Sequence, residues 1–221
     1  MIQLSHWQAL WKDRAVFLTG WATTIEVSVL ALLLALALGL IFGVIAVSPW
    51  RPLRWIAGVY VQFFQNTPLA VQVLFLYYGV HTLPVLGVGS IGLGTYTGAY
   101  MSEVIRAGIL SIHRGQLEAA LSQGMTYLQA MRHVILPQAV RVILPPMTNQ
   151  AINLIKNSSV LALISGGDLI YQADSWYSVN FLSGVALAAV GVLYLVLTLP
   201  LATWTRHLEQ RFARGRGVTA P

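Results

Sequence analysis

Long hydrophobic segments dominate this chain, and short polar segments separate them. Residues 27–47 and 55–80 contain no Asp, Glu, Lys or Arg, and largely apolar segments follow near 91–110, 145–165 and 178–205. A helix of about 20 apolar residues crosses the hydrocarbon core of a bilayer. The pattern predicts an all-α integral membrane protein with five transmembrane helices.

The polar segments between these helices predict their orientation. Residues 48–54 contain prolines and arginines and predict a cytoplasmic turn, whereas 81–90 and 166–176 lack Lys and Arg and are expected outside the cell. Most of the 13 Lys and Arg residues then lie in the cytoplasm, as the positive-inside rule requires, with the N-terminus outside and the C-terminus cytoplasmic. The expected divisions are an interfacial segment, a transmembrane domain and a basic cytoplasmic tail that carries Arg206, Arg211, Arg214 and Arg216: residues 1–18, 19–205 and 206–221.

The composition excludes a water-soluble globular protein. Hydrophobic residues make up 57% of the chain and charged residues 9%, against about 25% charged residues in soluble domains. The net charge of +6 is spread over separate loops, which argues against a nucleic-acid partner. The chain has no cysteine and its five histidines are scattered, so no disulfide and no metal site are expected.

The second predicted helix carries a row of uncharged polar side chains. On a continuous helix the amides fall on one side, and Pro68 is expected to kink the helix beside them. They either line a polar pathway or join helices by hydrogen bonds of ~0.6 kcal/mol each, and four amides on one face favour the pathway. The row consists of Gln62, Gln65, Asn66, Thr67 and Gln72.

The third and fourth predicted helices contain charged side chains. Glu103 and Arg106 are three residues apart, so they are expected to form an ion pair, with direct substrate contact as the alternative. A lysine inside a span costs about 2.5–3.5 kcal/mol on insertion scales, so Lys156 needs a packing partner such as Glu103 or a substrate contact. Lys156 lies on a second polar helix face, which we expect to share a water-filled cavity with the first. This face contains Asn149, Asn153, Lys156 and Asn157 and continues to Ser158.

Small residues and prolines shape the same two helices. Gly92, Gly94, Gly98 and Ala99 would allow close helix contact within the third span. Pro145-Pro146 is expected to kink or restart the chain before the fourth span.

Residues 116–144 form the longest segment in the middle of the chain that a bilayer would reject. Glu118, Ala119 and Ala120 have strong helix propensity, and Gly124 can adopt the left-handed conformation that ends one short helix before the next begins. Basic residues around this segment predict that it faces the cytoplasm.

This segment resembles the EAA loop of permease subunits of bacterial ABC importers. The flanking residues 66–69, 100–108 and 154–159 are similar to the polar amino acid permeases, and the resemblance covers about residues 20–205. It implies a type I ABC importer permease fold, in which the loop, here about 113–137, docks on an ATP-binding subunit. The resemblance assigns the expected ATPase-coupling role to Glu118, Ala119, Ala120, Gly124, Ile135, Leu136 and Pro137.

The resemblance also implies partners and a function. Two permease copies or two related subunits would line one path through the bacterial inner membrane. An extracytoplasmic solute-binding protein would deliver a polar amino acid, and an ATP-binding dimer, which binds ATP and Mg, would supply energy. The chain itself has no Gly-x-x-x-x-Gly-Lys loop, so no cofactor is expected in it. Gln65 departs from the family, in which an arginine often stands at this position.

Other functions are weighed against this one. An ATP-independent transporter or channel would need no ATP-binding partner, and an intramembrane enzyme would need a catalytic pair across helices, for which Lys156 with Ser158 or Ser159 is poorly spaced. Within the family, Lys156 and Arg106 outweigh the acidic residues of the path, which favours glutamate, aspartate or glutamine over arginine or histidine.

Overall fold

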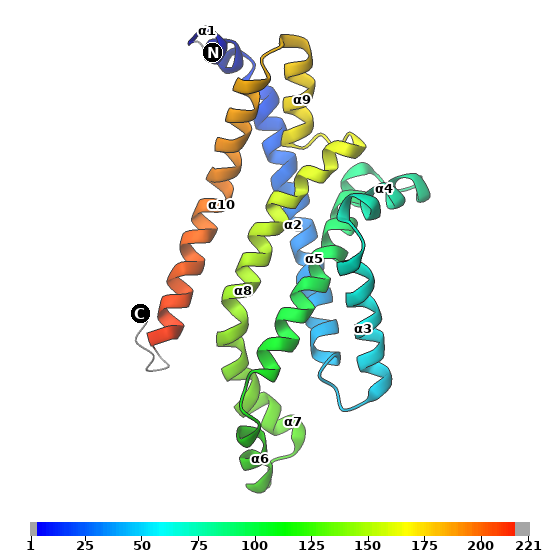
Figure 1. Ribbon diagram of the computed structural model, residues 1–221, viewed down its shortest axis with the longest axis vertical. Coiled ribbons are helices and arrows are strands. Elements are labelled where there is room, and N and C mark those ends of the chain that lie inside the picture. Colours follow the sequence, from blue (N-terminus) through cyan, green and yellow to red (C-terminus); the bar gives the residue numbers. More distant parts are fainter. Residues whose placement is uncertain (1–3, 215–221) are drawn as a thin grey trace.

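The computed structural model describes residues 4–214, which form an elongated bundle of helices without a strand (Figure 1). The helices α2, α5, α8 and α10 run along its length. The short α1 and α9 lie at the end that carries the N-terminus, and α6 and α7 lie at the opposite end. The elements are α1 (Leu4–Lys12), α2 (Arg14–Ile45), α3 (Arg51–Asn66), α4 (Leu69–Gly79), α5 (Val85–Leu110), α6 (Arg114–Ser122), α7 (Tyr127–Ala130), a π-helical turn (Met131–Ile135), α8 (Leu136–Asn157), a 3-10 helix (Ser158–Ile164), α9 (Leu169–Asn180) and α10 (Ser183–Arg214).

The packing of α2 against α5 forms the centre of the bundle. A Cβ atom added to Gly94 would lie 2.7 Å from Leu34 Cδ2, and one added to Gly39 would lie 2.7 Å from the Cβ of Met101. The two backbones therefore approach closely because small residues face large ones. This confirms the expected close packing of the glycine-rich third span.

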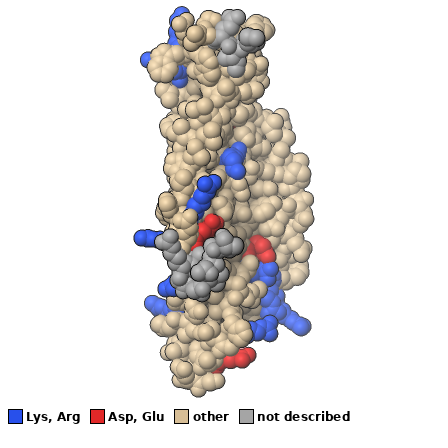
Figure 2. Space-filling model, turned by 60° about the vertical axis from the view of Figure 1, so that its left-hand side comes forward, with Lys and Arg blue, Asp and Glu red and all other residues tan. Residues whose placement is uncertain are grey.

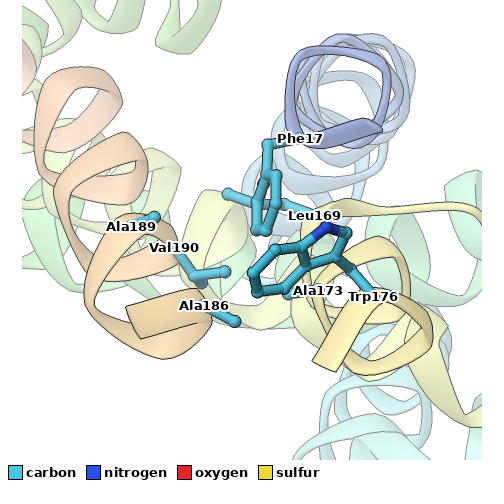
Figure 3. Packing of buried hydrophobic residues seen from close by; sticks show 7 residues of the cluster. All are labelled: Phe17, Leu169, Ala173, Trp176, Ala186, Ala189 and Val190. Carbon is cyan, nitrogen blue, oxygen red and sulfur yellow. The ribbon is translucent and has the colours of Figure 1, made fainter. Parts of the chain in front are cut away.

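A second buried cluster closes the end of the bundle near the N-terminus (Figure 3). Phe17 of α2 packs edge-on against Trp176 of α9, with ring centroids 5.6 Å apart. Ala186, Ala189 and Val190 of α10 complete the contact. The Trp21 indole also donates a hydrogen bond to the Leu193 carbonyl of α10, at 3.1 Å. α2, α9 and α10 therefore form one packed unit here.

Large apolar side chains cover much of the outside of the bundle. Leu33, Trp55, Phe75 and Val196 are all exposed. Among the described residues, α2 and the segment Ser183–Arg211 of α10 are long and apolar enough to cross a membrane, and α4 is a shorter apolar helix. An apolar exterior of this extent fits a bilayer rather than water.

The second predicted span is two helices rather than one kinked helix. α3 ends at Asn66 and α4 begins at Leu69. Thr67 is extended, with φ −109° and ψ 132°, because the ring of the following proline excludes the helical conformation. The expected kink is a complete break.

The prediction of a loop at 166–176 is also wrong, because α9 (Leu169–Asn180) occupies most of this segment. Asp168 caps α9, and Leu169, Ala173 and Trp176 are buried at an i, i+4, i+7 spacing. The absence of Lys and Arg suggested an external connection, but this apolar spacing predicts a helix.

Several helices are longer than the apolar segments that predicted them. α2 begins at Arg14, so the division predicted at residue 19 falls inside a continuous helix. α5 begins at Val85, inside the connection expected at 81–90. α10 continues through the predicted basic tail to Arg214, and Arg216 lies outside the described residues. The hydropathy pattern marks the part of a helix that can lie in lipid, whereas the helix itself continues until a capping or helix-breaking residue ends it.

The Pro145-Pro146 pair lies inside α8 and does not end it. The two prolines remove the α-helical donors of the Arg141 and Val142 carbonyls, and the Thr148 hydroxyl donates to a different carbonyl, that of Leu144, at 3.0 Å. α8 nevertheless continues from Leu136 at one end of the bundle to Asn157, which is followed by the 3-10 helix.

Candidate functional site

Residues 113–130, called the coupling elbow here, project from the end of the bundle opposite the N-terminus (Figure 1). Gly124 has φ +85°, so the predicted left-handed residue between two short helices is confirmed. The Gly124 N–H donates to the Leu121 carbonyl at 3.0 Å, and the Met125 N–H donates to the Ala120 carbonyl at 3.2 Å. These two bonds form a Schellman motif, which satisfies carbonyls at the end of α6.

The two helix starts of the coupling elbow are also capped. His113 Nδ1 accepts the Gly115 N–H at 3.1 Å and begins α6. Thr126 Oγ1 accepts the Gln129 N–H at 3.3 Å while Gln129 Oε1 accepts the Thr126 N–H at 2.8 Å, a complete capping box. Each short helix is therefore held by its own side chains, although neither is long enough to be stable alone.

The coupling elbow exposes its sequence motif and several apolar side chains. Glu118 and Ala119 are exposed, whereas Ala120 is 4% exposed and packs inward. Leu128 is 76% exposed, and Leu121 and Tyr127 are also exposed. Exposed apolar and aromatic side chains on a capped projection are typical of a docking surface.

The predicted Ile135-Leu136-Pro137 segment fastens the coupling elbow to the bundle. Ile135 is 4% exposed and lies in a buried cluster with Ile105 and Ile109 of α5 and with Ala139 and Ile143 of α8. A Cβ atom added to Gly108 would lie 2.3 Å from Ile143 Cγ1, which shows how tightly α5 and α8 pack at this level. A displacement of the elbow therefore acts directly on both helices.

Pro137 lies in the first turn of α8, directly after the π-helical turn. The Leu136 N–H still donates to the Met131 carbonyl in the π-helical register, and the proline removes the next backbone donor where that register changes to α-helical. The Gln138 side chain donates to the Val134 carbonyl at 2.8 Å, so side-chain bonding supports the widened turn. The motif residues thus have distinct roles: some face solvent and others fix the orientation of the tip.

The predicted amide row is divided by the break between α3 and α4. Gln72, on α4, is only 7% exposed, and its Nε2 donates to the Phe64 carbonyl at 3.0 Å and to the Thr67 carbonyl at 2.9 Å. These carbonyls lie beside the break that Pro68 imposes. Gln72 therefore does not share a helical face with the other amides, and its amide donates to the backbone at the break.

The other members of the row remain on α3 or at its end. Gln65 Nε2 donates to the Ala99 carbonyl of α5 at 3.3 Å. Asn66 Nδ2 donates to the Gln62 carbonyl and Thr67 Oγ1 to the Phe63 carbonyl, both at 2.8 Å. Gln62 and Asn66 are exposed, so this part of the row can still face a pathway.

Glu103 and Arg106 form the predicted ion pair on α5. Arg106 Nε donates to Glu103 Oε2 at 2.9 Å, and Arg106 NH2 donates to Glu103 Oε1 at 2.5 Å. This bidentate geometry occupies both carboxylate oxygens. Lys156 is exposed and, among residues 4–214, forms no ion pair with Glu103.

The polar face of α8 is directed out of the single chain. Asn149, Asn153 and Lys156 are exposed, and Asn157 is half-buried. Ser158 is buried and donates from Oγ to the Ile155 carbonyl at 2.8 Å. α5 lies between α3 and α8, so the two polar faces do not pack directly against one another (Figure 1). A cavity shared by both faces would have to include α5.

The capping role of a buried aspartate, Asp168, was missed from the sequence. Asp168 is fully buried, and its Oδ2 accepts the Ile170 N–H at 3.0 Å at the start of α9. The adjacent Leu169 N–H donates to Thr24 Oγ1 of α2 at 3.1 Å. Burial raises the pKa of Asp168 to about 6. An aspartate directly before an apolar helical spacing is the signal that would have identified this cap.

Comparisons with known proteins match nearly the whole chain. The family described as "Binding-protein-dependent transport system inner membrane component" matches residues 35–214. The chain is 40% identical over 212 residues to the probable glutamine ABC transporter permease protein GlnM of Bacillus subtilis (strain 168), covering 93% of this chain and 97% of that protein. It is 34% identical over 202 residues to the arginine transport system permease protein ArtQ of the same strain, covering 88% and 91%. A crystal structure of an amino acid ABC transporter with histidines matches with a TM-score of 0.87 at 32% identity, covering 96% of this chain and 99% of that one.

Proposed function

The chain belongs to the family of inner membrane components of binding-protein-dependent transport systems, and from this premise we propose that it is the permease subunit of an ABC importer for polar amino acids. The observation that carries the proposal is the coupling elbow, a capped and exposed projection that Ile135 of the adjoining π-helical turn joins to α5 and α8. Relatives named for glutamine and arginine transport support the substrate class.

We place the protein in the bacterial inner membrane with five spans. These are α2, the broken pair α3 and α4, α5, α8 with its 3-10 extension, and α10. The N-terminus and α9 lie outside the cell. The coupling elbow and the turn that contains Arg51 and Arg54 lie in the cytoplasm, where basic residues are favoured.

In the proposed mechanism a separate ATP-binding dimer moves the coupling elbows of two permease subunits, identical or related. ATP binding draws the elbows together and opens the path outward, where an extracytoplasmic solute-binding protein delivers the amino acid. Hydrolysis and release reopen the path inward. The elbow transmits force because its caps keep it rigid and because Ile135 joins it to α5 and α8. This chain binds and guides the substrate, and the ATPase performs the hydrolysis.

The proposed substrate is glutamine, glutamate or aspartate. Lys156 is an exposed cation on a face that also carries Asn149 and Asn153, and this set can pair with an α-carboxylate and with side-chain oxygens. Arg106 is already paired with Glu103, so it does not supply a second free cation. Basic amino acids are the alternative substrate class, which the arginine-named relative supports.

The coupling role is tested by a charge on α7 of the elbow. We expect Leu128→Glu to reduce co-purification of the ATP-binding subunit by at least tenfold, because a buried apolar contact would be replaced by an unpaired carboxylate. Val179→Glu, at the end of α9, is the matched control, since both side chains are 76% exposed. Equal co-purification of the two variants would rule out docking through this helix.

The substrate is tested by uptake into proteoliposomes that contain the whole importer. Saturable, ATP-dependent uptake of labelled glutamine is expected, with competition by glutamate or aspartate and weak competition by arginine and histidine. Preferred uptake of a basic amino acid would change the proposed substrate but leave the proposed permease role intact. Uptake of no amino acid, or uptake without ATP, would overturn the proposed function.

A further inference from the structure

An apolar groove lies on the outer surface at the end of the bundle that carries α1. Its volume is about 820 Å³, within the range of about 300–1,000 Å³ that is typical of pockets for small organic ligands. Side chains of α1, of the first turns of α2 and of α10 line it, among them Trp7, Trp11, Leu18 and Val192. A groove with this lining suits a hydrocarbon chain.

The floor of the groove is firmly packed. Phe17 and Ala189 belong both to the lining and to the buried cluster with Trp176 (Figure 3). At the turn between α1 and α2, the Trp176 indole donates to Asp13 Oδ2 at 2.9 Å. This bond links the α1–α2 turn to α9, so the groove is held open by contacts within the chain.

The rim of the groove is basic and aromatic. Arg14 and Trp11 line the groove, and Lys12, next to Trp11 in the chain, is exposed, whereas the intervening Asp13 accepts a hydrogen bond from Trp176. The Arg14 guanidinium lies 5.3 Å from the ring centroid of Trp11 and donates to the Trp11 carbonyl at 3.1 Å, which leaves further N–H groups available. On the face drawn in Figure 2, basic but no acidic side chains are visible at this end.

We propose that this groove binds one anionic phospholipid of the outer leaflet, with an acyl chain between α1 and α10 and the phosphate at Lys12 and Arg14. The depth in the membrane follows from the proposed topology and so depends on the proposed function. Tryptophans beside basic residues mark the level of lipid headgroups, and a cation next to an apolar groove distinguishes an anionic lipid from a zwitterionic one. Bound lipid would fix α1 against α10 and stabilise the outer end of the bundle.

The test is lipid binding to the full purified chain, counted by native mass spectrometry, with phosphatidylglycerol and phosphatidylcholine of identical acyl chains. We expect tighter binding of phosphatidylglycerol, by about fivefold for each of the two charges. The double variant Lys12→Gln/Arg14→Gln should bind both lipids equally. Glycerol phosphate without acyl chains should not compete.

Two further variants separate the headgroup from the chain. Arg51→Gln/Arg54→Gln removes two exposed arginines at the start of α3, beside the end of α2 that is remote from the groove. This variant should leave the preference for phosphatidylglycerol unchanged. Val192→Trp should fill the groove and weaken both lipids together. Equal binding of the two lipids by the unaltered chain, or a preference that survives Lys12→Gln/Arg14→Gln, would overturn the proposal. The assay needs neither ATPase nor amino acid, so its result is independent of the transport test.

Discussion

Gly124 and Asp168 show how single residues define this structure. Gly124 allows the chain to turn between two short helices, because its φ of +85° lies in the region that side chains with a Cβ avoid. Asp168 caps α9 from a fully buried position. Gly124 matters through its backbone conformation and Asp168 through a buried side chain. Substitutions at the two positions should therefore change different measured properties.

Replacement of Gly124 by alanine should loosen the coupling elbow without disturbing the bundle. No neighbouring atom lies within 4 Å of the added Cβ, so the cost is the left-handed backbone alone, about 1–2 kcal/mol. Amide hydrogen exchange in residues 114–130 should accelerate by about fivefold or more. Gly58→Ala is the control: it lies inside α3, also has open space around the new Cβ, and should leave amide exchange in residues 114–130 unchanged. Identical exchange in both variants would contradict the role assigned to Gly124.

Asp168 should make stability depend on pH in an unusual direction. Its pKa is raised from 3.8 to about 6, so between these values the folded protein keeps a proton that the unfolded chain has lost. The free energy of unfolding therefore falls as pH rises from about 4 to 6, and this contribution is constant above that range. Asp168→Asn cannot titrate and retains the cap, because an amide oxygen also accepts the Ile170 N–H.

The measurement is the difference in thermal midpoint between Asp168→Asn and the unaltered chain as a function of pH. This difference should grow in favour of the variant from about pH 4 to pH 6 and then level off. Ser178→Ala, at an exposed position on the same helix without a titratable group, should show no such rise. Parallel midpoint curves for Asp168→Asn and the unaltered chain would show that Asp168 titrates alike in both states.

At the level of elements, the break between α3 and α4 is the feature that sequence reasoning came nearest to predicting. Pro68 identified its position, and the polar residues around it were recognised. The contribution of Gln72 could not be read from helical angles, because those angles assume the continuous helix that the proline destroys. Only the folded chain places the Gln72 amide beside the Phe64 and Thr67 carbonyls.

Replacement of Gln72 by alanine should therefore destabilise the protein more than loss of an exposed amide. The change leaves two backbone carbonyls near the break without this donor, at a cost of about 1–3 kcal/mol. Asn66→Ala removes an exposed amide that bonds only to its own helix, and should change stability by roughly 0.5 kcal/mol or less. Thermal unfolding of the two variants in the same detergent compares them directly. A smaller loss in Gln72→Ala than in Asn66→Ala would refute the structural role.

At the level of the whole molecule, the five apolar segments all recur as helices, and the coupling elbow lies at the end opposite the N-terminus (Figure 1). These features were predictable because bilayer thickness and the positive-inside rule act on local sequence. The structure of the proposed substrate path was not predictable in the same way, because its candidate residues Asn149, Asn153 and Lys156 are exposed on the surface of the single chain. In the proposed importer, what they meet depends on a second permease subunit, about which the sequence of this chain contains no direct signal.

The proposed topology makes a sharp prediction, because the chain contains no cysteine and single cysteines can be introduced without a background. One span, α8 with its 3-10 extension, separates the coupling elbow from α9, so an odd number of crossings requires them to lie on opposite sides. A membrane-impermeant maleimide should therefore label Val179→Cys in intact spheroplasts. It should label Gln123→Cys only in inverted vesicles. Both positions are exposed, so a failure to react from one side reports the barrier rather than burial. Labelling of both from the same side would mean that α8 does not cross the membrane. In that case the elbow could not connect a cytoplasmic ATPase to a path that opens outside.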